Sequence, residues 1–176
     1  MSELSWNPSF SENDCKESIL ENSVHLLDLI FYLFGDFVDI ETRHIYLNGK
    51  IKAINSTLHY SPDKIVELRI SFGIPINNSI TVRFENSVAE CKPIEIFNSY
   101  DGMQMEPQNE KVSFKRYTPV SSKQWCLSKE DSLFKPGFYL QYQEFLKISN
   151  GLQIKIGANL NDAYKAQKLA HQLLWN

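Results

Sequence analysis

The chain has little glycine, few cysteines and no strong excess of charge of one sign. Only seven of its 176 residues are glycine, and the two closest, Gly151 and Gly157, lie six positions apart. Loops that bind phosphates or dinucleotides need clustered glycines, because the backbone must approach the phosphates closely. No P-loop or dinucleotide-binding motif can therefore be written for this sequence, and we expect no cofactor-binding residues in this chain.

The three cysteines, Cys15, Cys91 and Cys126, are too few and too widely spaced for a disulfide framework or a cysteine zinc site. Free thiols are typical of the cytoplasm. Residues 1–8 lack the basic and apolar segments of a signal peptide. The most apolar stretch, residues 24–34, is about half the length of a membrane span. We therefore expect a cytoplasmic protein that does not bind membranes.

The net charge limits the kinds of partner that the protein can have, and the composition and length limit the number of domains. Eighteen basic and twenty-one acidic residues give a net charge of -3, which does not favour nucleic acid as a partner. The hydrophobic fraction of 43% is ample for one core, and the length fits a single domain over residues 1–176.

Hydrophobic periodicity predicts an α+β fold. Apolar residues at helical spacing predict a helix over residues 20–34 that ends at Gly35. Alternating segments then predict about six strands in a mostly antiparallel open sheet, because the connections between them are short. We expect the outward residues of this sheet to include Thr42 and Thr81, and the arginines to face outward as well.

The C-terminal part of the sequence predicts helices packed on one face of that sheet. Proline and serine pairs predict a loop over residues 119–137, followed by a helix over residues 138–148 and a brief extended segment over residues 152–156. Asn159 and Asp162 have the spacing of a capping box at the start of a final helix.

The most informative residues are polar and lie on the first helix. Glu21, His25, Asp28 and Tyr32 follow one another at helical spacing and so share one face. Carboxylates near an imidazole can raise its pKa and suit it to proton transfer. The same residues could instead form a solvated face, or share a metal ion. Because no second histidine lies at matching spacing, the pattern favours no metal site.

Residues 18–36 resemble the segment that opens the C-terminal domain of the Gfo/Idh/MocA oxidoreductases, the glucose-fructose oxidoreductase and inositol dehydrogenase family. In that family an acidic residue precedes a histidine by four positions, an aspartate follows by three, and the helix ends in Gly-Asp or Gly-Glu. Residues 159–174 also resemble the family's last helix. The resemblance implies a domain that supplies substrate contacts and an oligomerisation sheet.

The resemblance also implies roles for individual residues. His25 matches the family's catalytic histidine and Glu21 its acidic partner, which is usually an aspartate. We expect Asp28 and Tyr32, on the same face, to contact the substrate. The family's NAD or NADP binds to an N-terminal Rossmann domain that also carries the catalytic lysine, and no position of this chain matches that lysine.

Two functions follow as hypotheses. The first is the substrate-binding and oligomerisation domain of an NAD(P)-dependent sugar or nucleotide-sugar oxidoreductase, with surface polysaccharide biosynthesis as its setting. It would form homo-oligomers through the sheet face and would be inactive as the isolated chain. The second is a non-catalytic sugar- or protein-binding dimerisation module that lost its dinucleotide-binding domain. An unrelated ligand pocket between helices and sheet is a third.

Overall fold

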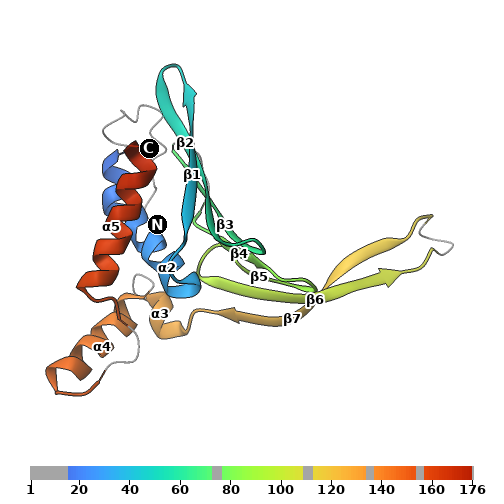
Figure 1. Cartoon of the computed structure of the whole chain (residues 1–176). Helices are drawn as coiled ribbons and strands as arrows, with labels where there is room; N and C mark the ends of the chain where they lie inside the picture. The colour runs from blue at the N-terminus through green and yellow to red at the C-terminus, as the bar shows by residue number, and fades with distance from the viewer. Residues whose placement is uncertain (1–15, 73–76, 109–112, 134–136, 154–156, 176) are drawn as a thin grey trace. The chain divides into compact units, whose positions relative to one another are not determined.

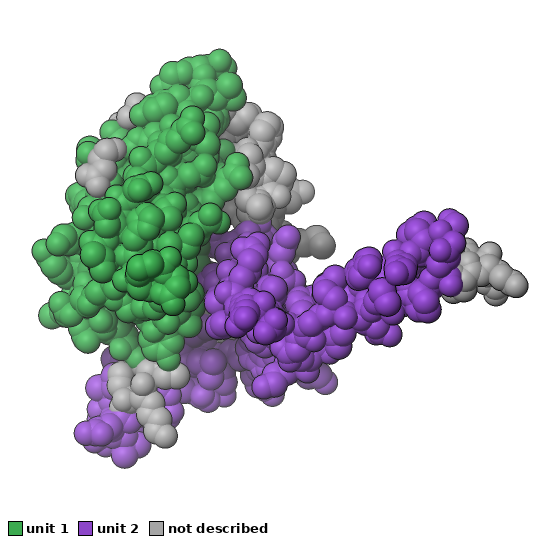
Figure 2. Space-filling model, turned by 45° about the vertical axis from the view of Figure 1, so that its right-hand side comes forward, with its two compact units in different colours: residues 1–75, 157–176 green, residues 76–156 purple. Residues whose placement is uncertain are grey.

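A computed structural model describes residues 16–72, 77–108, 113–133, 137–153 and 157–175 (Figure 1). The chain divides into two compact units, residues 1–75 with 157–176 and residues 76–156 (Figure 2). The α+β class and the antiparallel strands are confirmed, but the strands form a three-stranded and a four-stranded sheet rather than one sheet. The single domain expected from the length stays a prediction. None of the described helices is long and apolar enough to cross a membrane.

The first unit is a three-stranded sheet with helices on one face (Figure 1). Its sheet has the order β1-β2-β3, and both strand pairs are antiparallel. Its elements are η1 Ile19–Ser23, α2 Val24–Phe34, β1 Asp39–Leu47, β2 Lys50–Ser61, β3 Lys64–Ser71 and α5 Leu160–Trp175.

The core of this unit lies between the sheet and its two long helices. Leu27 of α2, Leu58 of β2 and Leu173 of α5 are each at most 1% exposed and belong to one cluster. Burying a side chain of this size stabilises the folded state by about 1.5–3 kcal/mol relative to leaving it in water. His44 of β1 adds a polar link, since its Nε2 lies 2.7 Å from the carbonyl oxygen of Leu173.

Local signals for the ends of these elements are confirmed. Gly35 ends α2 with a φ of +79°, and its amide donates to the carbonyl of Phe31 at 2.9 Å. Asn159 Oδ1 accepts from the amide of Asp162 at 3.2 Å, and Asp162 Oδ2 accepts from the amide of Asn159 at 2.9 Å. These reciprocal bonds form the capping box that the sequence predicts for α5.

The second unit is a four-stranded antiparallel sheet with two helices. The strand order is β4-β5-β6-β7, so that β4 and β7 are its edges. Its elements are β4 Ile80–Arg83, β5 Ser87–Cys91, β6 Ile96–Glu106, β7 Arg116–Cys126, α3 Lys129–Leu133 and α4 Phe138–Ser149.

The loop predicted over residues 119–137 is wrong at its start and again over residues 129–133, which form α3. Residues 116–126 form β7, and Pro119 lies opposite Met103 of β6 within this strand. Proline has no amide hydrogen to donate and is therefore tolerated on an edge strand, which β7 is. Of the predicted extended segment, residues 152 and 153 lie outside any strand, and residues 154–156 lie outside the described residues.

Thr42 does not face outward as predicted. Its Oγ1 lies 3.1 Å from Oγ of Ser56, which is only 4% exposed on the helix-covered face of the sheet. Successive residues of a strand point to opposite faces, so Arg43 lies on the other face, where it is exposed. Thr81, in the second unit, is exposed as predicted.

Candidate functional site

The first helix contains a π-helical turn that ends two residues before His25. Residues 16–18 are α-helical, Ile19–Ser23 form the turn η1, and α2 continues from Val24. Hydrogen bonds in such a turn run from residue i to i+5, which places one more residue in the turn than an α-helix has. The sequence predicts a regular helix here, because no proline or glycine marks the irregularity.

Three of the four predicted site residues share one side of α2. At about 100° per residue, His25, Asp28 and Tyr32 lie opposite Leu27 and Ile30, which enter the core. His25 is exposed, Asp28 is half-buried and Tyr32 is 66% exposed. The structure thus confirms that these three residues share a face of α2, whereas their roles in catalysis and substrate binding stay predictions.

Glu21 lies inside the π turn and is exposed. Its spacing from His25 is therefore not that of a regular α-helix. Among the described residues, no hydrogen bond or ion pair joins Glu21, His25, Asp28 and Tyr32. An exposed imidazole with carboxylates on the same helix can nevertheless exchange protons with a ligand bound over this face.

The end of α2 is fixed by two lysines. Lys165 of α5 donates to Asp36 at 2.7 Å, so the aspartate of the Gly-Asp pair ties the end of α2 to the last helix. Lys64 donates to the carbonyl oxygen of Phe34 at 2.8 Å and lies 4.6 Å from the centre of the Tyr60 ring. Burial, together with the charge of Asp36, raises the pKa of the Tyr60 hydroxyl.

The described residues include neither a cluster of metal ligands nor a cysteine with features of a reactive thiol. No group of three or more histidine, cysteine, aspartate or glutamate side chains in the described part of the chain could hold a metal ion. Burial raises the pKa of the Cys91 thiol, which disfavours the reactive thiolate. Cys126 is a free, exposed cysteine on an edge strand.

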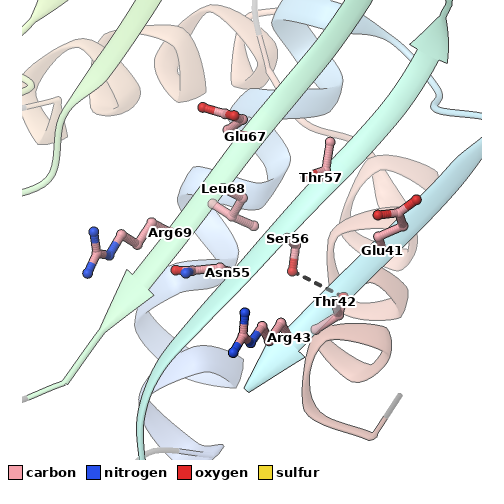
Figure 3. Close-up of a pocket in the computed structure, with 9 residues that line it drawn as sticks. All are labelled: Glu41, Thr42, Arg43, Asn55, Ser56, Thr57, Glu67, Leu68 and Arg69. Carbon is pink, nitrogen blue, oxygen red and sulfur yellow. Dashed lines mark hydrogen bonds between the residues drawn. The ribbon is translucent and has the colours of Figure 1, made fainter. Parts of the chain in front are cut away.

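A solvent-exposed hollow of about 430 Å³ lies on the uncovered face of the β1–β2–β3 sheet (Figure 3). Charged residues at its rim come from the two outer strands, and polar residues of β2 lie between them. The lining residues with side chains on this face are Glu41, Arg43, Asn55, Thr57, Glu67 and Arg69, whereas Thr42, Ser56 and Leu68, which also line the hollow, have side chains on the helix-covered face. The sequence predicts that Arg43 and Arg69 lie on the outward face of the sheet, and this is confirmed. The hollow itself was not predicted, because the register of three separate strands brings its lining residues together.

The described residues do not fit a dinucleotide. Dinucleotide-binding folds place the pyrophosphate on a glycine-rich turn between a parallel strand and a helix. Every described strand pair here is antiparallel. The described glycines stand singly rather than in the cluster that such a turn requires.

Comparison with known proteins places the fold. No family model and no curated protein matches the sequence. The solved structure of a Gfo/Idh/MocA family oxidoreductase from Vibrio cholerae matches 90% of this chain at 12% identity and a TM-score of 0.52. The chain has the fold of part of a Gfo/Idh/MocA oxidoreductase. The resemblance seen in the first helix is thus confirmed for the fold.

Two further structures show the same similarity to oxidoreductases. A dehydrogenase named MviM from Clostridium difficile matches over 90% of this chain, with 13% identity and a TM-score of 0.63. UDP-N-acetylglucosamine 3-dehydrogenase GnnA from Acidithiobacillus ferrooxidans matches over 93%, with 13% identity and a TM-score of 0.60. The chain covers 48% of the first, 50% of the second and 44% of the Vibrio protein, so it spans about half their length.

Proposed function

We propose that this chain is the substrate-binding and oligomerisation domain of an NAD(P)-dependent sugar or nucleotide-sugar oxidoreductase. The similarity of its fold to half of the UDP-N-acetylglucosamine 3-dehydrogenase is the observation that carries the proposal. The helix of residues 18–36 supports it, because its sequence resembles the corresponding segment of this family. We place the protein in the cytoplasm and its reaction in surface polysaccharide biosynthesis.

In this proposal the chain contributes proton transfer and substrate contacts. His25 accepts or donates the proton of the hydroxyl being oxidised, and Glu21 and Asp28 lie near it along the same helix. Tyr32 offers the sugar an aromatic face and a hydroxyl. Because the described residues do not fit NAD(P), we assign the dinucleotide to a second domain.

The π turn supports this assignment of His25. Such turns within α-helices occur frequently at functional sites. Here the turn ends at Ser23, two residues before His25. A helix that only covered a sheet would not require this irregularity.

Nucleotide-sugar binding tests the proposal on the chain itself. Titration with UDP-N-acetylglucosamine, followed by NMR of the histidine rings, should shift the His25 signals in a saturable way. His171 is the internal control, because it stacks on Trp175 of α5, with ring centres 4.6 Å apart. Equal shifts of both histidines, or no saturable shift of His25, would count against the proposal.

Substitution of Tyr32 tests the substrate contact. Tyr32→Ala should weaken UDP-N-acetylglucosamine binding about fivefold, since a stacked aromatic contact contributes about 1 kcal/mol. Tyr164→Ala is the matched control, because Tyr164 is 65% exposed on α5 and Tyr32 is 66% exposed on α2. An unchanged affinity of the Tyr32 variant would remove Tyr32 from the substrate site.

Cofactor binding tests where the dinucleotide lies. NADH fluorescence should show no saturable binding to this chain, whereas micromolar binding would overturn its assignment to a second domain. In an enzyme that joins this domain to a dinucleotide-binding domain, His25→Ala should lower turnover by about a hundredfold or more. An unchanged turnover would remove His25 from the catalytic role.

A second candidate function is a non-catalytic sugar- or protein-binding dimerisation module. It is favoured by the absence, among the described residues, of any bond between His25 and a carboxylate. It predicts that joining the chain to a dinucleotide-binding domain gives no turnover that depends on His25, and that Tyr32→Ala still weakens sugar binding.

The oligomerisation part of the proposal is a homo-oligomer formed through a sheet face. Antiparallel sheets with one uncovered face can pack face to face on another sheet. Light scattering at high protein concentration should therefore give at least twice the mass of the chain. A strictly monomeric mass would overturn this part of the proposal.

A further inference from the structure

Gln167 of α5 contacts the π turn of the first helix. Its side-chain Nε2 lies 3.3 Å from the carbonyl oxygen of Leu20, the second residue of η1. The two residues are 147 positions apart in the sequence, so the contact joins the last helix of the first unit to the start of the first helix. It belongs to a larger packing arrangement, since α5 lies against both η1 and α2 (Figure 1).

A π turn within an α-helix creates a need for such a donor. In an α-helix each carbonyl accepts from the amide four residues later, whereas in a π turn it accepts from the amide five residues later. Where the spacing returns from five to four, the next amide bonds two carbonyls further on, and the carbonyl between them is passed over. A backbone carbonyl without a donor costs free energy unless a side chain or water supplies one. The Leu20 carbonyl has its donor in Gln167.

The turn sets the direction of His25 because the helix is held in the core on both sides of it. Ile19, the first residue of the turn, is 0% exposed, and Leu27 of α2 is 1% exposed. Both belong to the same cluster of buried residues. One extra residue in a turn rotates everything after it by about 100° around the helix axis relative to everything before it. A regular α-helix over the same residues would therefore turn His25 away from its present direction relative to Ile19.

The residue two positions before Gln167 holds the other end of the same helix. Nζ of Lys165 lies 2.7 Å from the carboxylate of Asp36, which follows the last residue of α2 by two positions. Ala166, between the two side chains, is 1% exposed, so Lys165 and Gln167 flank the buried side of α5. α5 therefore holds the first helix at two places, the π turn before His25 and the C-terminal end.

We propose that Gln167 is a positioning residue for His25. Its side-chain amide pairs the carbonyl that the π turn passes over, stabilises the turn and so maintains the direction of the imidazole. Gln167 acts only through the turn and contacts neither the substrate nor the cofactor. The inference rests on the proposed function for the role of His25, whereas the pairing of the turn needs no ligand and can be measured without one.

Amide hydrogen exchange tests the pairing on the full chain. Gln167→Met removes the donor but keeps an unbranched side chain with a similar helix propensity. Exchange of the backbone amides of residues 23–25 should become about fivefold faster, because the turn loses one hydrogen bond. The ring signals of His25 in NMR spectra should move, and those of His171 on α5 should not. Gln167→Lys, which restores an N–H donor, should return both readouts toward those of the wild-type chain.

Gln172→Met is the matched control for the exchange experiment. It makes the same chemical change near the end of the same helix, and should leave both the exchange of residues 23–25 and the His25 signals unchanged. Circular dichroism checks that both variants are folded. Equal effects of the two substitutions would overturn the proposal, because they would reflect a general weakening of α5. Wild-type exchange and wild-type His25 signals in Gln167→Met would also overturn it, whether or not the chain binds a sugar.

A double-mutant cycle tests whether Gln167 acts through His25. In an enzyme that joins this domain to a dinucleotide-binding domain, Gln167→Met should lower turnover about fivefold or more, and Gln167→Lys should restore it. In the His25→Ala background the same substitution should cause no further loss, because the group that it positions is gone. A full further loss in that background would overturn the positioning role. If exchange changes as expected but turnover does not depend on His25, the proposed function fails, and the positioning role fails with it.

Discussion

The two units of the chain bury their apolar side chains to very different extents. All thirteen buried hydrophobic residues that the structure describes belong to the first unit. In the second unit, β7 is exposed along its whole length, and α4 has no buried residue. The first unit thus has a core of its own, formed where two helices cover one face of a sheet.

The second unit leaves apolar side chains in water. Met103, Met105 and Tyr117 on the β6–β7 hairpin are at least 50% exposed, as are Tyr142 and Phe145 on α4. Met105 pairs with Tyr117 across the hairpin, so these two side chains share one face. The comparison teaches that sequence periodicity reports which residues could be buried, while burial itself depends on an element that covers them.

The largest expected effect contrasts one buried residue with one exposed residue. Leu58→Ala in β2 should lower the free energy of unfolding by about 2–5 kcal/mol, because it removes a fully buried side chain and leaves a cavity. Tyr142→Ala in α4 should change it by less than about 0.5 kcal/mol, because Tyr142 is 61% exposed. Urea denaturation of both variants measures the difference, and equal losses would break the comparison between the units.

The sequence predicted what is set by local chemistry. Gly35 ends the first helix because a positive φ is easy only for glycine, and Asn159 with Asp162 starts the last helix through its own side-chain bonds. Asn48 and Gly49, with φ of 53° and 74°, form the tight turn between β1 and β2. Each of these signals acts within a few residues.

Features that depend on distant partners could not be predicted in the same way. Pro119 indicates a loop by itself, and only its place on the edge of a sheet makes a strand acceptable there. The π turn before His25 has no local signal at all. The helix face was predictable from spacing for three of the four candidate residues, whereas the hollow beside Arg43 and Arg69 required the register of three strands.

A smaller effect should follow from the different helix starts in the two units. Asn159→Ala removes the side-chain oxygen that accepts from the first turn of α5, and should lower the free energy of unfolding by about 0.5–2 kcal/mol. The matched control is Asn161→Ala, because Asn161 is exposed in the same turn. In the second unit, α4 starts at Gly137 with no side-chain cap to remove. Equal losses from both substitutions, measured by urea denaturation, would contradict a specific cap.

The smallest effect concerns the buried hydroxyl of Tyr60 at the edge of the first unit's core. The Tyr60 hydroxyl oxygen is buried with no hydrogen-bond partner, and both burial and Asp36 raise its pKa. Tyr60→Phe should therefore leave the free energy of unfolding at neutral pH unchanged or raise it by up to about 1 kcal/mol. Tyr164→Phe is the control, because Tyr164 is 65% exposed.

The pH dependence of the same variant gives a second readout. A pKa that is raised in the folded state means that the unfolded chain loses its tyrosine proton first, at about pH 10. Stability from this group is therefore complete below about pH 10 and is lost as the pH rises toward the folded-state pKa. Tyr60→Phe should reduce the loss of stability above pH 10, and Tyr164→Phe should not. If both variants lose stability above pH 10 as steeply as the wild-type chain does, deprotonation of Tyr60 is not the cause of that loss.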